Sequence, residues 1–192
     1  IGPDFFRHAN ELENELWQIK AKAEYEVGDH LLKVGFERDD QSTFNLFVPG
    51  SEGSYEFASI ADYQARTAST LFYNNAVTND ENDGAASWGF AVNSLYLQDT
   101  WQVTDKLTVN GGIRYDWYES DGEIEENPNF VQRYGFTNST DVEGLSILMP
   151  RFGFNYEYNE DITLRGGLGR FSGGSPAVWL SNNYSNTGVG ID

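Results

Sequence analysis

Alternating oxygen-bearing side chains make residues 79–84, Asn-Asp-Glu-Asn-Asp-Gly, a candidate metal loop. Asn79, Glu81 and Asp83 stand at alternate positions, and the glycine allows a sharp turn, which is a weak form of the calcium-loop pattern. The bidentate Glu that closes such a loop is absent, because the twelfth position counted from Asn79 is Phe90. We therefore expect no cofactor other than calcium here, and a solvated acidic loop is the alternative.

A tryptophan among asparagines near residue 180 is the second candidate site. Amide groups both donate and accept hydrogen bonds, and loops held by a rigid scaffold often carry binding residues. The candidate ligand- or cargo-binding residues are Trp179, Asn182, Asn183, Tyr184 and Asn186.

Catalytic groups do not converge in the sequence. His8 and His30 are far apart, and His30 beside a turn is expected to be solvated. Residues 172–175, Ser-Gly-Gly-Ser, lack the strand–Ser–helix pattern and the Asp and His partners of a nucleophile elbow. We expect that the protein is not an enzyme.

The composition narrows the class of protein. Thirty acidic and twelve basic residues give a net charge of −18, which argues against a nucleic-acid partner. Cysteine is absent, so no disulfide or thiol chemistry is possible. Twenty glycines and 15% aromatic residues suit an all-β chain with many turns.

The elements that must carry these residues are strands. Residues 95–117 predict two strands joined by a short turn at 103–106. In the second strand, apolar residues from Leu107 to Trp117 alternate with polar ones, so one face suits an apolar medium and the other suits water. The strand is long enough to cross a membrane, which takes about 9–11 tilted residues.

This two-strand unit occurs three times, which predicts hairpins at about 14–38, 87–118 and 148–171. The connections between them, 39–86, 119–145 and 172–192, are long and polar. Short turns at one end and long loops at the other are the layout of bacterial outer-membrane barrels. The fold class we predict is all-β: antiparallel up-and-down strands of an incomplete transmembrane β-barrel, about six strands with short periplasmic turns and long extracellular loops.

Two details refine this prediction. The apolar phase changes between Val92 and Leu95, for which we expect a bulge near 93–94. Aromatic residues lie near both strand ends and predict two interfacial girdles: Trp17, Trp88 and Trp117 near the long loops, and Tyr25, Trp101 and Tyr158 near the short turns.

The second hairpin resembles the barrel signature of TonB-dependent outer-membrane receptors, a Gln-Asp-x-Trp strand followed by Leu-Thr-x-Asn-x-Gly-x-Arg-Tyr-Asp. Those positions are Gln98, Asp99, Trp101, Leu107, Thr108, Asn110, Gly112, Arg114, Tyr115 and Asp116. The Oar-like branch is similar in its Gly-rich strand and Pro-x-Val-Trp-x-Ser-Asn loop, here Pro176, Val178, Trp179, Ser181, Asn182, Tyr184, Ser185, Asn186 and Gly188.

The resemblance implies a plug inside a barrel of about twenty-two strands, in the outer membrane of a Gram-negative bacterium. It implies as partners the membrane lipid, the rest of the receptor including its plug, a periplasmic energy-coupling protein, and an unknown nutrient or protein cargo. Because six strands are too few, residues 1–192 are expected to be a partial barrel without the plug.

Two other functions stay open. The chain could form a structural polymer in which copies pair edge to edge. It could instead be a soluble, lectin-like β-sandwich whose apolar strand faces meet in a core.

Overall fold

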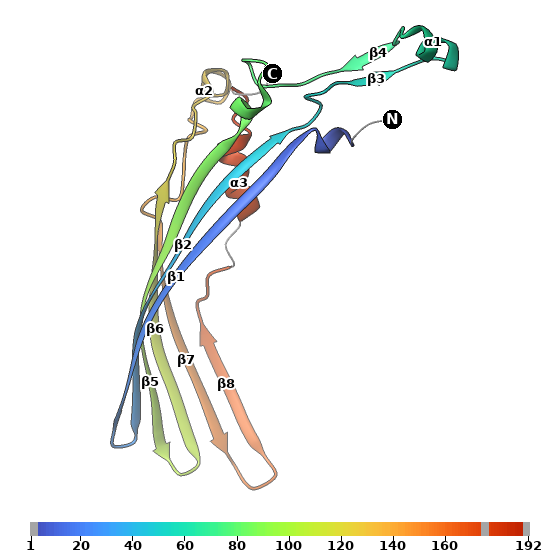
Figure 1. Cartoon of the computed structure of the whole chain (residues 1–192). Helices are drawn as coiled ribbons and strands as arrows, with labels where there is room; N and C mark the ends of the chain where they lie inside the picture. The colour runs from blue at the N-terminus through green and yellow to red at the C-terminus, as the bar shows by residue number, and fades with distance from the viewer. Residues whose placement is uncertain (1–3, 174–176, 190–192) are drawn as a thin grey trace.

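Six long antiparallel strands form one curved sheet in the computed structural model, which describes residues 4–173 and 177–189 (Figure 1). Each strand pairs with the next long strand along the chain. Their order across the sheet is β1 (Ala9–Val27), β2 (His30–Val48), β5 (Ala86–Thr104), β6 (Leu107–Asp121), β7 (Ser146–Glu157) and β8 (Thr163–Gly169). The predicted up-and-down arrangement of six strands is confirmed.

The smaller elements lie in the connections. A two-stranded sheet of β3 (Ser54–Glu56) and β4 (Thr70–Phe72) encloses α1 (Ile60–Ala65), and this unit projects beyond the large sheet (Figure 1). The remaining elements are η1 (Phe5–Arg7), η2 (Glu81–Gly84), α2 (Pro128–Tyr134) and α3 (Ala177–Ser185). Among the described residues, no helix is long and apolar enough to cross a membrane.

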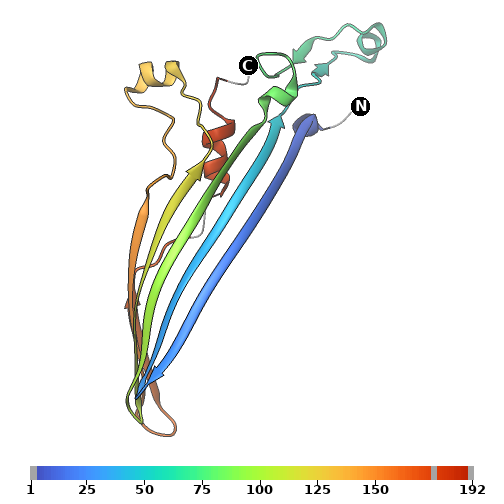
Figure 2. The same cartoon turned by 60° about the vertical axis from the view of Figure 1, so that its left-hand side comes forward.

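The tight turns gather at one end of the sheet and the long connections at the other, in both views (Figures 1 and 2). We call these the turn end and the loop end. At the turn end, Gly28 has φ of +59°, a left-handed conformation that glycine adopts without strain. This separation of short and long connections is the one predicted from the sequence.

Two predicted segments have different bounds in the structure. The hairpin expected at 14–38 covers 9–48, so residues 39–48 belong to β2 and not to a loop. The loop expected at 119–145 begins only after β6 ends at Asp121. The predicted loop at 172–192 contains α3, and its residues 174–176 and 190–192, including Ser175 and Pro176, lie outside the described residues.

The strand pairing divides the sheet into two faces, because directly paired residues of antiparallel strands point the same way. One face, which we call the band face, has four successive rows of mainly apolar residues starting at the turn end. The first row is Val27, His30, Trp101, Val109 and Phe154, and the fourth is Ala21, Phe36, Leu95, Tyr115 and Leu148. Nearer the loop end the same face carries Glu11, Glu13, Glu15, Ser42 and Asp121. The predicted strands ended too early because their ends were placed where the apolar residues of this face stop. The strands themselves continue toward the loop end with polar residues on the same face.

The other face, which we call the helix face, contacts α3. It is polar near the turn end, and near the loop end it adds the buried rings of Trp88 and Phe90, each 6% exposed. The bulge expected near 93–94 was wrong, since β5 pairs without interruption through these residues and its irregularity lies between Gln102 and Thr104. The apolar residues of β5 change from one face to the other along the strand, because Trp88 and Phe90 are buried on the helix face whereas Leu95 and Leu97 lie on the band face. Trp88 is therefore not a girdle residue.

Candidate functional site

The helix α3 packs against the loop end of the helix face. Leu180 and Tyr184 are each 9% exposed, and the Tyr184 ring stacks on Trp88 with 5.3 Å between centroids and 5° between planes. Burial, together with the nearby carboxylates of Asp141 and Asp121, raises the pKa of Tyr184 above its ordinary value. The Tyr184 ring is thus a neutral packing group at physiological pH.

The predicted ligand-binding residues divide into two kinds. Asn183 Nδ2 donates to the carbonyl of Thr140 at 3.2 Å and joins α3 to the loop after β6, whereas Asn186 Nδ2 donates to Asn182 Oδ1 at 2.8 Å at the C-terminal end of α3. Tyr184 is covered by Trp88. Trp179 is 75% exposed, which leaves its ring available to a ligand.

A hollow of about 220 Å³ lies beside α3, against β1, β2 and the part of β5 that carries Trp88. Most of the surface that lines it is apolar, and the amides and hydroxyls come from β1 and β2, where Asn14 accepts hydrogen bonds from Gln41 and Thr43. Its residues are Leu12, Asn14, Gln41, Thr43, Asn45, Trp88 and Ser181. The sequence did not single out Leu12, Gln41, Thr43 and Asn45, because they belong to strand ends that it assigned to a loop or left outside the hairpins.

Two of the three candidate calcium residues accept hydrogen bonds from neighbouring hydroxyls, and the third, Glu81, begins η2. Asp83 Oδ2 accepts from the Thr78 hydroxyl at 2.6 Å, and Asn79 Oδ1 accepts from the Tyr73 hydroxyl. The Asp80 side chain caps η2, and its hydrogen bonds with Asn82 lower the pKa of Asp80. In the described part of the chain, no three His, Cys, Asp or Glu side chains lie close enough to hold a metal. The calcium site stays a prediction from the sequence.

Arg114 joins three strands on the helix face. Its Nε donates to Asp116 Oδ1 at 2.8 Å, its Nη1 donates to Glu37 Oε2 at 2.9 Å, and its Nη2 donates to the Ser94 hydroxyl at 2.6 Å. Asp116 is 4% exposed, so this carboxylate depends on the guanidinium for its pairing. Two residues of the receptor-like signature, Arg114 and Asp116, therefore hold the wall together.

His30 was expected to be a solvated surface histidine, but its ring contacts two neighbouring side chains. Its Nδ1 lies 2.7 Å from Asp99 Oδ2, and its ring stacks on Trp101 at 5.2 Å. Both contacts lie on the band face at the turn end. The pairing accounts for Asp99, an acidic residue on an otherwise apolar face.

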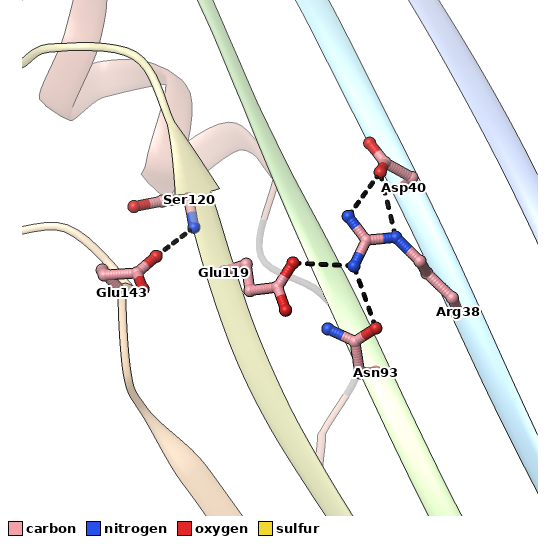
Figure 3. A network of polar contacts seen from close by, with 6 residues as sticks. All are labelled: Arg38, Asp40, Asn93, Glu119, Ser120 and Glu143. Carbon is pink, nitrogen blue, oxygen red and sulfur yellow. Dashed lines mark hydrogen bonds and ion pairs between the residues drawn. The ribbon is translucent and has the colours of Figure 1, made fainter.

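A second arginine network marks the limit of the apolar rows on the band face (Figure 3). Arg38 Nη1 donates to Glu119 at 2.7 Å and to Asn93 at 3.0 Å, and Arg38 Nη2 donates to Asp40 at 2.8 Å. These residues come from β2, β5 and β6, and they lie one or two rows beyond Phe36 and Leu95. Polar bonding thus replaces apolar contact at one level across three strands.

Comparison with family models decides the class of protein. Residues 3–190 match the model of the outer membrane beta barrel domain. The chain belongs to this family. Searches of the curated proteins and of the solved structures gave no match.

The six-stranded sheet is accordingly an incomplete outer-membrane β-barrel, with its wall open at β1 and β8 among the described strands. The β-sandwich alternative was wrong, because it requires two sheets packed face to face and these strands form one sheet.

Proposed function

We propose that this barrel wall is part of an Oar-like, TonB-dependent receptor that binds a nutrient or protein cargo and moves it across the outer membrane of a Gram-negative bacterium. The observation that carries the proposal is the division of the sheet into a banded face and a polar face that ends under α3. The band face would meet lipid and the helix face would line the path of the cargo.

The apolar length of β1 supports a bilayer as its surroundings. On this strand the apolar phase runs through the four rows from Val27 to Ala21 and continues at Ile19 and Trp17, level with the Arg38 network, so that it advances by ten residues in all. Ten residues cover about 33 Å along a strand. At a barrel tilt of about 40° this distance corresponds to about 25 Å, the height of a lipid-facing band. The acidic residues beyond Trp17 would then stand outside the membrane.

The residues of the receptor-like signature stabilise the barrel wall. The residues that recognise the cargo would lie at the loop end. Arg114, Asp116 and Asp99 are occupied by partners within the sheet. The Trp179 ring and the hollow beside α3 are open at the loop end, although Asn14 in the hollow already accepts hydrogen bonds from Gln41 and Thr43. We propose that they contact the cargo, that the rest of the receptor supplies the plug, and that a periplasmic protein supplies the energy. Binding and transport, rather than catalysis, is the role that these groups support.

The proposal is tested in the source bacterium by comparing the passage of solutes and secreted proteins with and without the receptor gene. We expect any gene-dependent passage to stop when a protonophore collapses the inner-membrane potential. Trp179→Ala should reduce this passage at normal receptor levels in the membrane. Tyr134→Ala, which alters another exposed aromatic on α2, is the matched control. Passage that continues in uncoupled cells would contradict energy-coupled transport.

A structural polymer is the second candidate. It is favoured by the unpaired edges of β1 and β8, which within the described residues each pair on one side only. Exposed strand edges are templates for further pairing. Electron microscopy of purified outer membranes separates the two, since a polymer requires regular arrays of the protein.

A further inference from the structure

A recess of about 390 Å³ lies on the helix face between β5 and β7, away from α3. Most of the side chains around it are polar, and backbone forms much of its floor. Those side chains include Glu37, Tyr96, Gln98, Asn110, Arg114 and Arg151, and the floor includes Gly112 and Gly153.

The register makes this part of the wall unusually bare. Gly112, Arg151 and Gly169 form one row of the helix face, and Asn110, Gly153 and Gly167 form the next. Four of these six positions therefore have no side chain. Such a surface allows a flat group to approach the backbone closely.

The fold itself explains only some of these glycines. A Cβ at Gly167 would lie 2.7 Å from the Phe152 carbonyl oxygen, and one at Gly112 would lie 3.2 Å from the Leu97 carbonyl oxygen. A Cβ at Gly153 would meet nothing closer than the Gly166 carbonyl oxygen at 3.6 Å, an ordinary contact. The wall has room for a side chain at position 153, so the packing of the strands does not require a glycine there.

The charge in the recess is positive at Arg151. Arg114 is neutralised by Glu37 and Asp116. Arg151 forms no ion pair with any described residue, and its guanidinium lies 4.7 Å from the centre of the Phe171 ring. A guanidinium supplies a planar fork of donors that matches carboxylate and phosphate groups.

We propose that this recess is an anion-binding site on the inner wall of the barrel, and that it takes a solute bearing a carboxylate or a phosphate. Arg151 pairs with the anionic group, the side-chain amides of Gln98 and Asn110 offer further donors, and Gly153 provides the space. The site rests on the proposed function, since it needs the helix face to line the transport path.

The test is titration calorimetry on the purified outer-membrane protein in detergent, with citrate and inorganic phosphate as probes. We expect at least one probe to bind the unaltered protein, and tighter binding of citrate or of phosphate identifies the preferred group. Arg151→Gln and Gly153→Leu should each weaken this binding at least tenfold. Arg133→Gln, which removes a positive charge on the external helix α2, should leave it unchanged.

The two substitutions fail in different ways, so the outcome is decisive. If Gly153→Leu does not fold, Arg151→Gln still removes the charge without adding bulk. The site is overturned if the unaltered protein binds neither probe, or if Arg151→Gln binds as tightly as the unaltered protein. Calorimetry in detergent needs no energised membrane. If neither probe binds but passage still depends on the inner-membrane potential, only this site is rejected. If a probe binds but passage continues in uncoupled cells, only the transport proposal is rejected.

Discussion

Glycine residues in these strands have different causes, which the sequence does not distinguish. Gly35 leaves the space that the Tyr96 ring occupies, and Gly167 lies against the neighbouring backbone. Gly111 has open space where a side chain would stand, and so does Gly153 apart from one ordinary contact. Whether a strand position requires a glycine therefore depends on the atoms of the neighbouring strand.

Alanine at these positions should separate the two cases. Gly167→Ala places a methyl group against the Phe152 carbonyl, and we expect it to destabilise the wall by about 1–3 kcal/mol, as overpacking does. Gly153→Ala meets no such contact and should change stability by less than about 0.5 kcal/mol. Urea unfolding of the protein refolded in lipid vesicles measures both. Equal losses would show that the wall has no room at position 153.

At the scale of elements, the strands were predicted from the sequence and the helices were not. Alternation identified all six strands because it persists through the apolar band. It ended early on β1, because Glu15, Glu13 and Glu11 occupy the face that Trp17 to Val27 keep apolar. The helix α2 carried readable signals that we missed, an Asn127 cap, Pro128 at the first position and Gly135 in a left-handed conformation after the end.

The candidate site shows the limit of such inference. Trp179 could be predicted as an available aromatic, and its exposure agrees with that role. The burial of Tyr184 could not be predicted, because it depends on Trp88, which is far away in the sequence. The recess at Arg151 could not be predicted either, since it depends on the register of β5, β6 and β7.

The stacking of Trp88 on Tyr184 predicts how α3 is held. Trp88→Ala removes a stacked pair worth about 0.5–1.5 kcal/mol in addition to the buried area. We expect α3 to detach from the wall, so that amide exchange and proteolysis of residues 177–185 increase while β5 keeps its protection. Trp17→Ala, which removes a 68% exposed tryptophan from the band face, is the control and should leave α3 protected. Unchanged exchange in α3 after Trp88→Ala would assign its position to other contacts.

Neighbouring residues on β5 test the assignment of the faces. Leu97 lies in the middle of the band, pairs with Val34 and Ile113, and is 52% exposed, whereas Gln98 points to the helix face. Leu97→Arg should cost about 2–4 kcal/mol in a bilayer, the usual penalty near its midplane. Gln98→Arg should cost much less, because it enters a polar recess. Unfolding from vesicles measures both, and equal costs would contradict a lipid-facing band.

At the scale of the whole molecule, charge and shape follow one axis. The turn end holds the apolar band, and the loop end holds acidic residues on the same face, with α3 across the other face. Nonetheless, several large apolar side chains of the band are about half exposed, among them Leu95, Leu97 and Val34. Apolar surface of this extent on a soluble monomer indicates a missing environment or partner.

The open edges predict what the assembled protein must supply. Within the described residues, β1 pairs only with β2, so alternate backbone groups of a 19-residue strand have no partner in this sheet. In a bilayer each unsatisfied group costs several kcal/mol, so the edge must be closed by another strand. We expect all amides of β1 within the band to be equally protected from hydrogen exchange in the complete protein in vesicles, including those that do not bond to β2.

Light scattering in detergent then identifies the source of the closing strand. A monodisperse single-copy particle means strands of the same protein, and larger assemblies mean other copies. Rapid exchange of every second amide in β1 would show that the edge is open, and would contradict both a closed barrel and a polymer.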